Sequence, residues 1–527
     1  MTALAARKQA QTNDITSMGA GELAALIANG DLTSAEVVEA HIARIEEVNP
    51  RLNAVVWKRY DAARVEAREA DARRAAGAKL GPLHGVPVTI KESIDVAGSP
   101  ATFGITGRAG SRAERDEVHV ARLREAGAIV LGKTNVAQLL MYYESDNPLY
   151  GRTNNPWNLE RAPGGSSGGE AAIIAAGGSP LGIGTDVGGS VRIPAHFSGL
   201  ASLKPTTGRT PDLGRYSVPL GQGAIVSQIG VLARQVVDVA LGLEVIAGKG
   251  GDGLQPIGTP GAVDLSRLRV AYIESDDSFP AAPGVRRAVR EAAAILGRSG
   301  ARVTEWRMPE AETVLGVFFG IFSADGGRYL KAALNGSKAD PRIAQIQMLA
   351  GRSRRTLAVL GGLLRMLGQQ GMANGIRAFG HRDTANYWQL VEAQHDYRER
   401  FSAALDSADG GPFDVILSPT CPLPAFTHGA AADLVTAGPY SILYNVLGYP
   451  AGVVPVTRVR PGEESERAAS RDRVVAAARK VEAGSAGLPL GVQVAARPWQ
   501  EHVALAAMQA IEEGAKAGSD FPATPVV

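Results

Sequence analysis

The sequence predicts an α/β fold in which helices cover a layered sheet. Short β-branched runs alternate with helical stretches: residues 118–131 indicate a helix followed by a strand, and residues 268–309 indicate a strand, a helix and a strand. Such alternation favours a layered α/β core over an all-α or all-β fold. The 527 residues, 45% apolar and 20% charged, are enough for one large core or for two domains.

The N-terminal part, residues 17–76, is expected to consist of scaffold helices. The pattern is helical from residue 17 to 56, and Thr33 and Glu36 have the spacing of a capping box ahead of an apolar stripe. Residues 61–76 continue as a charged surface helix.

Residues 81–235 hold the expected catalytic core, which starts with a short buried strand ending at Lys91. A lysine after apolar residues often extends its ammonium to the surface. A lysine that stays buried loses its proton readily, because desolvation disfavours the charged form. Lys91 is therefore either a surface lysine or a base that is neutral near pH 7.

Two glycine-cradled serine clusters, residues 164–169 and 184–190, are joined by an apolar run at 171–176. Each ordered glycine loses much backbone entropy, so two such clusters need a reason. A flexible linker would not carry so many apolar residues. Glycine also lets the backbone approach a reacting group and direct N–H donors at it, as an oxyanion hole requires.

Two other motifs compete for this stretch. Residues 165–169 satisfy G-x-S-x-G, the nucleophile elbow of Ser-His-Asp hydrolases, although the preceding residues 155–163 indicate a loop rather than the strand that an elbow needs. Residues 182–184 begin like a dinucleotide-binding fingerprint, but Val187 stands where its third glycine belongs. Both remain minor alternatives.

The second half starts with a helical cap segment at residues 311–405, which has almost no strand signal. Within it, residues 352–378 are rich in leucine and arginine, which fits a buried cap helix or a helix that contacts a membrane surface. Residues 458–484 indicate a charged surface insertion with a short helix. Strand-like sequence returns at residues 414–418, 440–456 and 487–494, and a last helix follows at 501–513.

Composition excludes several classes of function. The net charge of +2 gives no general field for nucleic acid. The single cysteine, Cys421, excludes an internal disulfide and fits a reducing compartment, and the eight histidines have no metal-ligand spacing. The first 19 residues lack a secretory signal, and no window approaches the roughly 20 apolar residues of a membrane span. These features predict a cytoplasmic protein without a metal.

The block GTDVGGSVRIP at residues 184–194 and the position of Ser190, 24 residues after Ser166, resemble the amidase signature serine hydrolases. The resemblance implies that Ser190 is the nucleophile, Ser166 the bridging serine and Lys91 the base, with a cis peptide between Gly165 and Ser166. It further implies a single domain over residues 1–527, built on a large mixed twisted sheet covered by helices, and no cofactor.

Further site residues are expected around these three. The oxyanion hole would use the N–H groups of Val187, Gly188, Gly189 and Ser190, and Ser167 would donate near the lysine. Asp186 and Arg192 would hold the loop, or form a plain structural ion pair. Leu140, Met141, Phe318 and Phe322 would line an acyl pocket, or belong to the core.

Within the family, the chain is most similar to the fatty acid amide hydrolase branch, through residues 145–151, 325–328, 444–456 and 497–501. We expect it to differ from that branch in having no N-terminal membrane span. We expect a homodimer that hydrolyses small-molecule amides with an apolar acyl or aryl group, with activity on esters or carbamates. Two alternatives are the amidase subunit of a tRNA-dependent amidotransferase, and a binding protein that kept the fold without catalysis.

Overall fold

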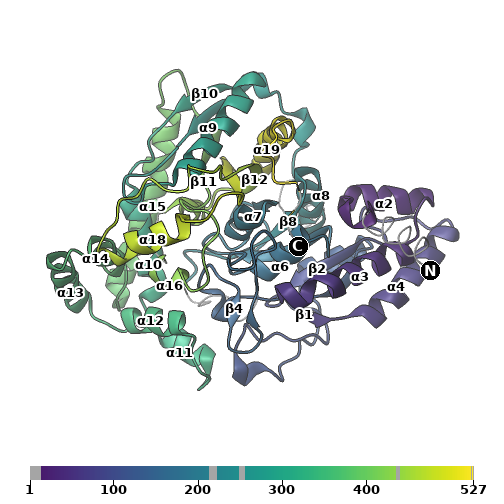
Figure 1. The fold of residues 1–527 in the computed structure, drawn as a ribbon, viewed down its shortest axis with the longest axis horizontal. Helices are drawn as coiled ribbons and strands as arrows, with labels where there is room; N and C mark the ends of the chain where they lie inside the picture. Colours follow the sequence, from purple (N-terminus) through teal and green to yellow (C-terminus); the bar gives the residue numbers. More distant parts are fainter. Residues whose placement is uncertain (1–13, 213–221, 249–255, 435–438, 524, 526–527) are drawn as a thin grey trace.

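The computed structural model describes residues 14–212, 222–248, 256–434, 439–523 and 525 (Figure 1). Its centre is an eleven-stranded sheet of mixed direction in the order β1-β3-β2-β6-β8-β7-β12-β13-β11-β9-β10, and this confirms the predicted α/β class. The strands are β1 (Val55–Lys58), β2 (Pro87–Lys91), β3 (Ile129–Thr134), β6 (Leu181–Asp186), β7 (Ala201–Lys204), β8 (Gln228–Ala233), β9 (Arg269–Tyr272), β10 (Arg302–Glu305), β11 (Val415–Pro419), β12 (Ala451–Arg458) and β13 (Pro489–Ala496).

Helices cover both faces of the sheet, because successive strand residues point to opposite sides. On β8, Val231 lies against Gly242 of a helix on one face, whereas Leu232 joins the apolar cluster of Ala195 on the other. The first face carries α8 (Val236–Ala247), α9 (Pro283–Arg298) and α19 (Glu501–Lys516), and the second carries α3 (Ser34–Leu52), α4 (Tyr60–Ala75), α6 (Gly168–Ala175) and α7 (Arg192–Ser198).

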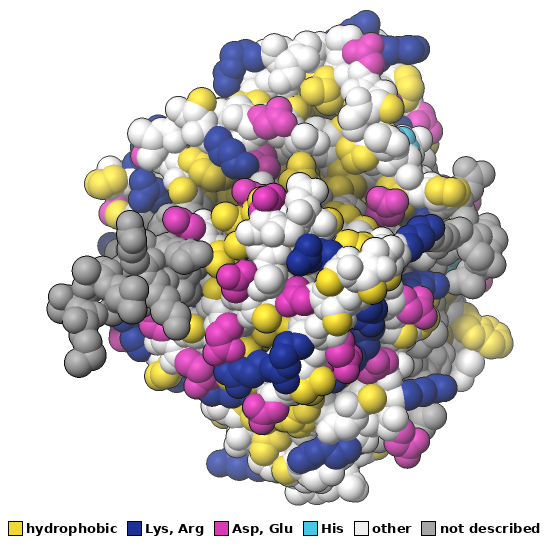
Figure 2. All heavy atoms as spheres, turned by 90° about the vertical axis from the view of Figure 1, so that its right-hand side faces the viewer, with side chains coloured by type: hydrophobic (Ala, Val, Ile, Leu, Met, Phe, Trp, Pro, Cys, Tyr) yellow, Lys and Arg dark blue, Asp and Glu magenta, His cyan; other side chains and the backbone are white. Residues whose placement is uncertain are grey.

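The N-terminal helices follow the prediction with one exception. Thr33 and Glu36 form the capping box of α3, preceded by α2 (Ala20–Asn29). Residues 55 and 56, expected at the end of a helix, instead belong to β1, because Asn53 ends α3 in a left-handed conformation and the β-branched Val55, followed by Trp57 and Lys58, then pairs with β3. Basic and acidic side chains are interspersed on the face that these helices share (Figure 2). The first 19 residues were predicted to lack a secretory signal, and residues 1–13 of this stretch lie outside the part of the chain that the structure describes.

Residues 311–405 are helical, as predicted. They form α10 (Ala311–Ser323), α11 (Arg328–Leu334), α12 (Pro341–Ala350), α13 (Arg354–Met366), α14 (Gln370–Ile376) and α15 (Thr384–Asp406). A single buried helix over residues 352–378 is wrong: Gly368 breaks it into α13 and α14, and α13 buries only Leu357 and Gly361. None of the described helices is both long and apolar enough to cross a membrane.

One C-terminal segment differs from the prediction. Residues 440–447, expected as part of a strand, form α17 (Tyr440–Leu447), which ends at Gly448 in a left-handed conformation. A short apolar run has no period that separates a buried helix from a strand. In the charged insertion, α18 (Arg473–Glu482) buries Val474, Ala478 and Val481.

Candidate active site

Lys91 lies at the carboxyl end of β2, beside the parallel strand β6. Because parallel strands end at the same edge of a sheet, the side chain of Lys91 meets Thr185 at the end of β6. Its Nζ donates to Ser166 Oγ at 2.7 Å and to Thr185 Oγ1 at 2.8 Å, and the side chain is fully buried.

Burial lowers the pKa of Lys91 to about 7, because desolvation disfavours the ammonium. The negative charges of Asp212, Asp186 and Glu170 oppose this shift without overcoming it. Lys91 can therefore exist as a neutral amine near pH 7, and a surface position for it is excluded.

The serines lie where two packed helices begin. Ser166 and Ser167 directly precede α6, Ser190 lies two residues before α7, and the Gly165–Ser166 peptide is cis. The Ser167 N–H donates to Ser190 O at 3.2 Å, and Ser167 Oγ donates to Thr185 O at 3.5 Å. The structure thus brings Lys91, both serine segments and Thr185 together. Sequence reasoning missed Thr185, although it stands inside the matched block.

The loop after β6 directs only part of its backbone toward the site. Asp186 accepts from the Gly189 N–H at 2.9 Å and from the Val191 N–H at 3.2 Å. The Gly189 donor, expected in the oxyanion hole, is thereby engaged elsewhere. Val187, Gly188 and Ser190 donate their N–H groups to no acceptor among the described residues. These three N–H groups therefore remain as candidate donors to an oxyanion.

Arg192 is the buried centre that holds this loop. Its guanidinium donates to Asp186 Oδ1 at 2.9 Å, to Asn445 Oδ1 at 2.6 Å and to Gln493 Oε1 at 2.6 Å. Burial alone would raise the pKa of Asp186, but the Arg192 charge and the donors from Arg192 and Asn445 hold it well below its usual range. The pair is fully buried and joins the loop to the C-terminal segments.

The carbonyl of Gly188 accepts two hydroxyl groups. Tyr143 Oη donates to it at 2.8 Å and Ser441 Oγ at 3.0 Å. These contacts fix the orientation of the Gly188–Gly189 peptide next to Ser190. Neither residue was predicted, because nothing in the sequence relates positions 143, 188 and 441.

An apolar pocket of about 710 Å³, including its opening to solvent, reaches Ser190. It contains Leu140, Met141, Phe318 and Phe322, the four residues predicted to line it. The remaining lining residues are Tyr142, Tyr143, Val187, Gly188, Phe319, Ser323, Ile346, Phe379 and Ala431.

The wall of this pocket contains an unusual turn. Leu139 and Leu140 have φ angles of 53° and 61°, which residues with a side chain rarely adopt. Each such residue costs about 1–3 kcal/mol and persists only where the surroundings hold it.

No cluster of three or more His, Cys, Asp or Glu side chains suited to a metal lies in the described part of the chain. A family model described as Amidase matches residues 36–505. The chain belongs to the amidase family. This amidase is an amide hydrolase, and the residues matched by the family model include Lys91, Ser166 and Ser190.

Curated relatives and solved structures agree with this family. The amidase is 34% identical over 507 residues to fatty-acid amide hydrolase 1 of Sus scrofa, covering 93% of this chain and 84% of the relative. It is also 34% identical over 467 residues to a glutamyl-tRNA(Gln) amidotransferase subunit of Salinispora arenicola, covering 84% and 91%. A solved fatty acid amide hydrolase superposes with a TM-score of 0.81 at 26% identity, covering 97% of this chain and 87% of the other.

Proposed function

We propose that this amidase hydrolyses amides with an apolar acyl or aryl group through a Ser190–Ser166–Lys91 triad. The observation that carries the proposal is the 2.7 Å contact between Lys91 Nζ and Ser166 Oγ inside a fully buried site. A neutral amine in hydrogen-bond contact with a hydroxyl can accept its proton.

In this mechanism, Lys91 takes the Ser166 proton while Ser166 takes the proton of Ser190 Oγ, which attacks the carbonyl carbon. The N–H groups of Val187, Gly188 and Ser190 stabilise the oxyanion. When the tetrahedral intermediate collapses, the C–N bond breaks and a proton returns through Ser166 to the leaving amine. Water then attacks the acyl-enzyme by the same relay and releases the acid and Ser190.

The chemistry of the pocket supports an apolar substrate. None of the lining residues that the structure describes is Lys, Arg, Asp or Glu, and Phe318, Phe319, Phe322 and Phe379 form a large part of the wall. Esters and carbamates with the same apolar group would fit the same site. A fluorophosphonate probe tests the nucleophile: it should label the wild-type protein and not Ser190→Ala. Unchanged labelling of Ser190→Ala would contradict the assignment.

The alternative is the amidase subunit of a tRNA-dependent amidotransferase, which releases ammonia from glutamine. The similarity to the Salinispora arenicola protein favours it, but the described lining of the apolar pocket has no charged partner for the amino and carboxylate groups of free glutamine. The purified chain should hydrolyse an acyl anilide and not glutamine. Glutamine hydrolysis without anilide hydrolysis would favour the amidotransferase.

We also propose peripheral contact of residues 352–378 with an anionic membrane surface, and a cytoplasmic homodimer as the assembly. On α13 the apolar side chains of Val359, Leu363 and Met366 are 66%, 52% and 83% exposed, next to Arg354 and Arg355. Cosedimentation with phosphatidylserine vesicles should be lost in Leu363→Glu. Light scattering of the vesicle-free protein measures the dimer.

A further inference from the structure

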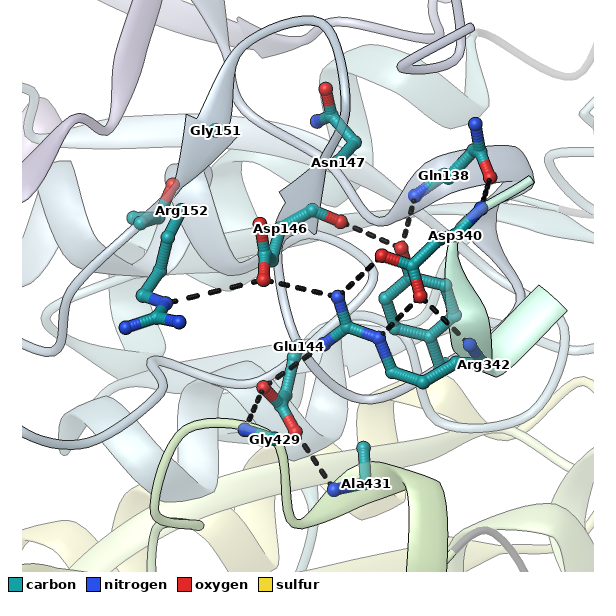
Figure 3. Close-up of polar contacts among 12 residues, drawn as sticks. Gln138, Glu144, Asp146, Asn147, Gly151, Arg152, Asp340, Arg342, Gly429 and Ala431 are labelled. Atoms are coloured by element: carbon teal, nitrogen blue, oxygen red, sulfur yellow. Dashed lines mark hydrogen bonds and ion pairs between the residues drawn. The ribbon is translucent and has the colours of Figure 1, made fainter. Parts of the chain in front are cut away.

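A buried guanidinium joins three segments of the chain behind the pocket wall. Arg342 is the second residue of α12, and its side chain is 9% exposed. Figure 3 shows it directed toward Glu144 and Asp146 from one segment and toward Asp340 at the start of its own helix. Arg342 itself lines a smaller hollow that shares Tyr142, Ile346, Phe379 and Ala431 with the large pocket.

The contacts of Arg342 use the planar fork of the guanidinium. Nε and Nη2 donate to the two oxygens of Asp340 at 2.7 and 2.8 Å. Nη1 donates to Glu144 Oε2 at 3.1 Å, and Nη2 donates to Asp146 Oδ2 at 3.0 Å. The guanidinium carbon lies 4.2 Å from the ring centroid of Tyr142. A lysine could supply the charge but not this set of directions.

Glu144 extends the connection to a third segment. Its carboxylate accepts from the Gly429 N–H at 2.8 Å and from the Ala431 N–H at 2.7 Å (Figure 3). Tyr142, Ala431 and Ile346, which lies one turn after Arg342 on α12, each line the pocket. One guanidinium therefore stands behind walls contributed by three parts of the chain.

The strained turn at Leu139 and Leu140 lies within this arrangement. On its N-terminal side, Gln138 Oε1 accepts from the Asp340 N–H at 2.7 Å and Gln138 Nε2 donates to Lys338 O at 3.1 Å. On its C-terminal side, Tyr142 packs under Arg342. The residues that begin α12 thus hold both ends of a turn that would otherwise relax.

We propose that Arg342 is a positioning residue that determines acyl-chain specificity. It holds the pocket wall at residues 139–143 against α12, and so sets the affinity for a long apolar acyl group without touching the reacting atoms. This inference rests on the proposed hydrolysis of apolar acyl amides.

The test compares acetyl and dodecanoyl p-nitroanilides with wild type and Arg342→Met, after titration of active enzyme with a fluorophosphonate. The long acyl group needs the wall and the short one does not. We expect KM for the dodecanoyl substrate to rise about tenfold in Arg342→Met. The kcat for that substrate, and both KM and kcat for the acetyl substrate, should stay within about twofold of the wild-type values. In Arg342→Lys, KM for the dodecanoyl substrate should lie between the values for wild type and Arg342→Met. If Arg342→Met does not fold, Asp146→Asn removes one charged partner of Arg342, together with the 4.0 Å ion pair to Arg152, and should raise KM for the dodecanoyl substrate in the same direction.

A matched control is Arg400→Met, which removes an exposed ion pair with Glu310 on the same helical segment. Arg400→Met should leave KM and kcat for both substrates unchanged. A wild-type ratio of the two KM values in folded Arg342→Met, or an equal loss of kcat on both substrates, would overturn the inference alone. A wild-type enzyme that does not prefer the long acyl group would overturn the proposed substrate class as well.

Discussion

At the scale of single residues, the proposed relay depends on the protonation state of Lys91. A base must be neutral, and burial lowers the pKa of Lys91 to about 7, so kcat/KM should rise with pH through about 7 and then level off. Lys91→Ala should lose several orders of magnitude in amide turnover and less in ester turnover, because an alkoxide leaves with less need of a proton than an amine. A pH–rate profile for both substrates measures this.

Lys133 on the adjacent strand β3 provides the matched control. It is also fully buried, and burial lowers its pKa to about 8, but its Nζ bonds Ser99 Oγ and the carbonyl of Pro100 instead of a reacting group. In correctly folded Lys133→Met, kcat/KM should still rise with pH through about 7. Near-normal amide turnover in Lys91→Ala, or a histidine variant that abolishes turnover while folded, would contradict the relay.

A second residue-scale prediction concerns Tyr143, whose hydroxyl donates to the Gly188 carbonyl. Tyr143→Phe removes one of the two hydroxyl groups that donate to this carbonyl, a hydrogen bond with a net value of about 1 kcal/mol. We therefore expect kcat to fall about fivefold to tenfold with little change in KM. Ser441→Ala should have a similar effect. In the double variant, the fold-reduction in kcat should exceed the product of the two single reductions, since neither hydroxyl group then donates to the carbonyl. Steady-state kinetics of the four proteins gives the coupling, and simple additivity would contradict a shared role.

At the scale of elements, α10 supports the loop that follows β6. A Cβ built on Gly188 would lie 2.9 Å from Phe318 Cζ, which is closer than real contacts allow. Gly188→Ala should therefore displace the loop and lower kcat about tenfold or more. Phe318→Leu, which frees space at that point, should restore a large part of the activity in the double variant. Kinetics of both single variants and the double variant tests this, and no recovery would exclude the contact with α10 as the cause.

The limits of prediction from sequence are clearest at individual elements. The strand ending at Lys91 and the capping box of α3 were predictable, because local pattern and local chemistry determine them. Helix α17 was not, since an apolar run buried on all sides carries no period and resembles a strand. The contacts of Tyr143 and Arg342 were not predictable either, because they depend on how distant segments pack.

At the scale of the whole molecule, Arg192 links the two halves of the chain. Arg192→Met would leave Asp186 as a buried, unpaired carboxylate, so the free energy of unfolding should fall by about 3–5 kcal/mol. Urea denaturation measures the change. Arg64→Met, which removes an exposed ion pair with Glu39, should change the same quantity by less than about 1 kcal/mol. Similar losses for both variants would show that burial of the charge is not the cause.

The reach of Arg192 also has a consequence for the protein during its synthesis. Lys91 and both serines precede Arg192 in the chain, whereas Gln493, which accepts a hydrogen bond from the guanidinium, is translated 301 residues after Arg192. Until then the loop that carries Ser190 lacks the C-terminal partners of Arg192. We therefore expect the nascent chain to carry its reactive groups in a latent form, and to become competent for hydrolysis only after translation has passed Gln493.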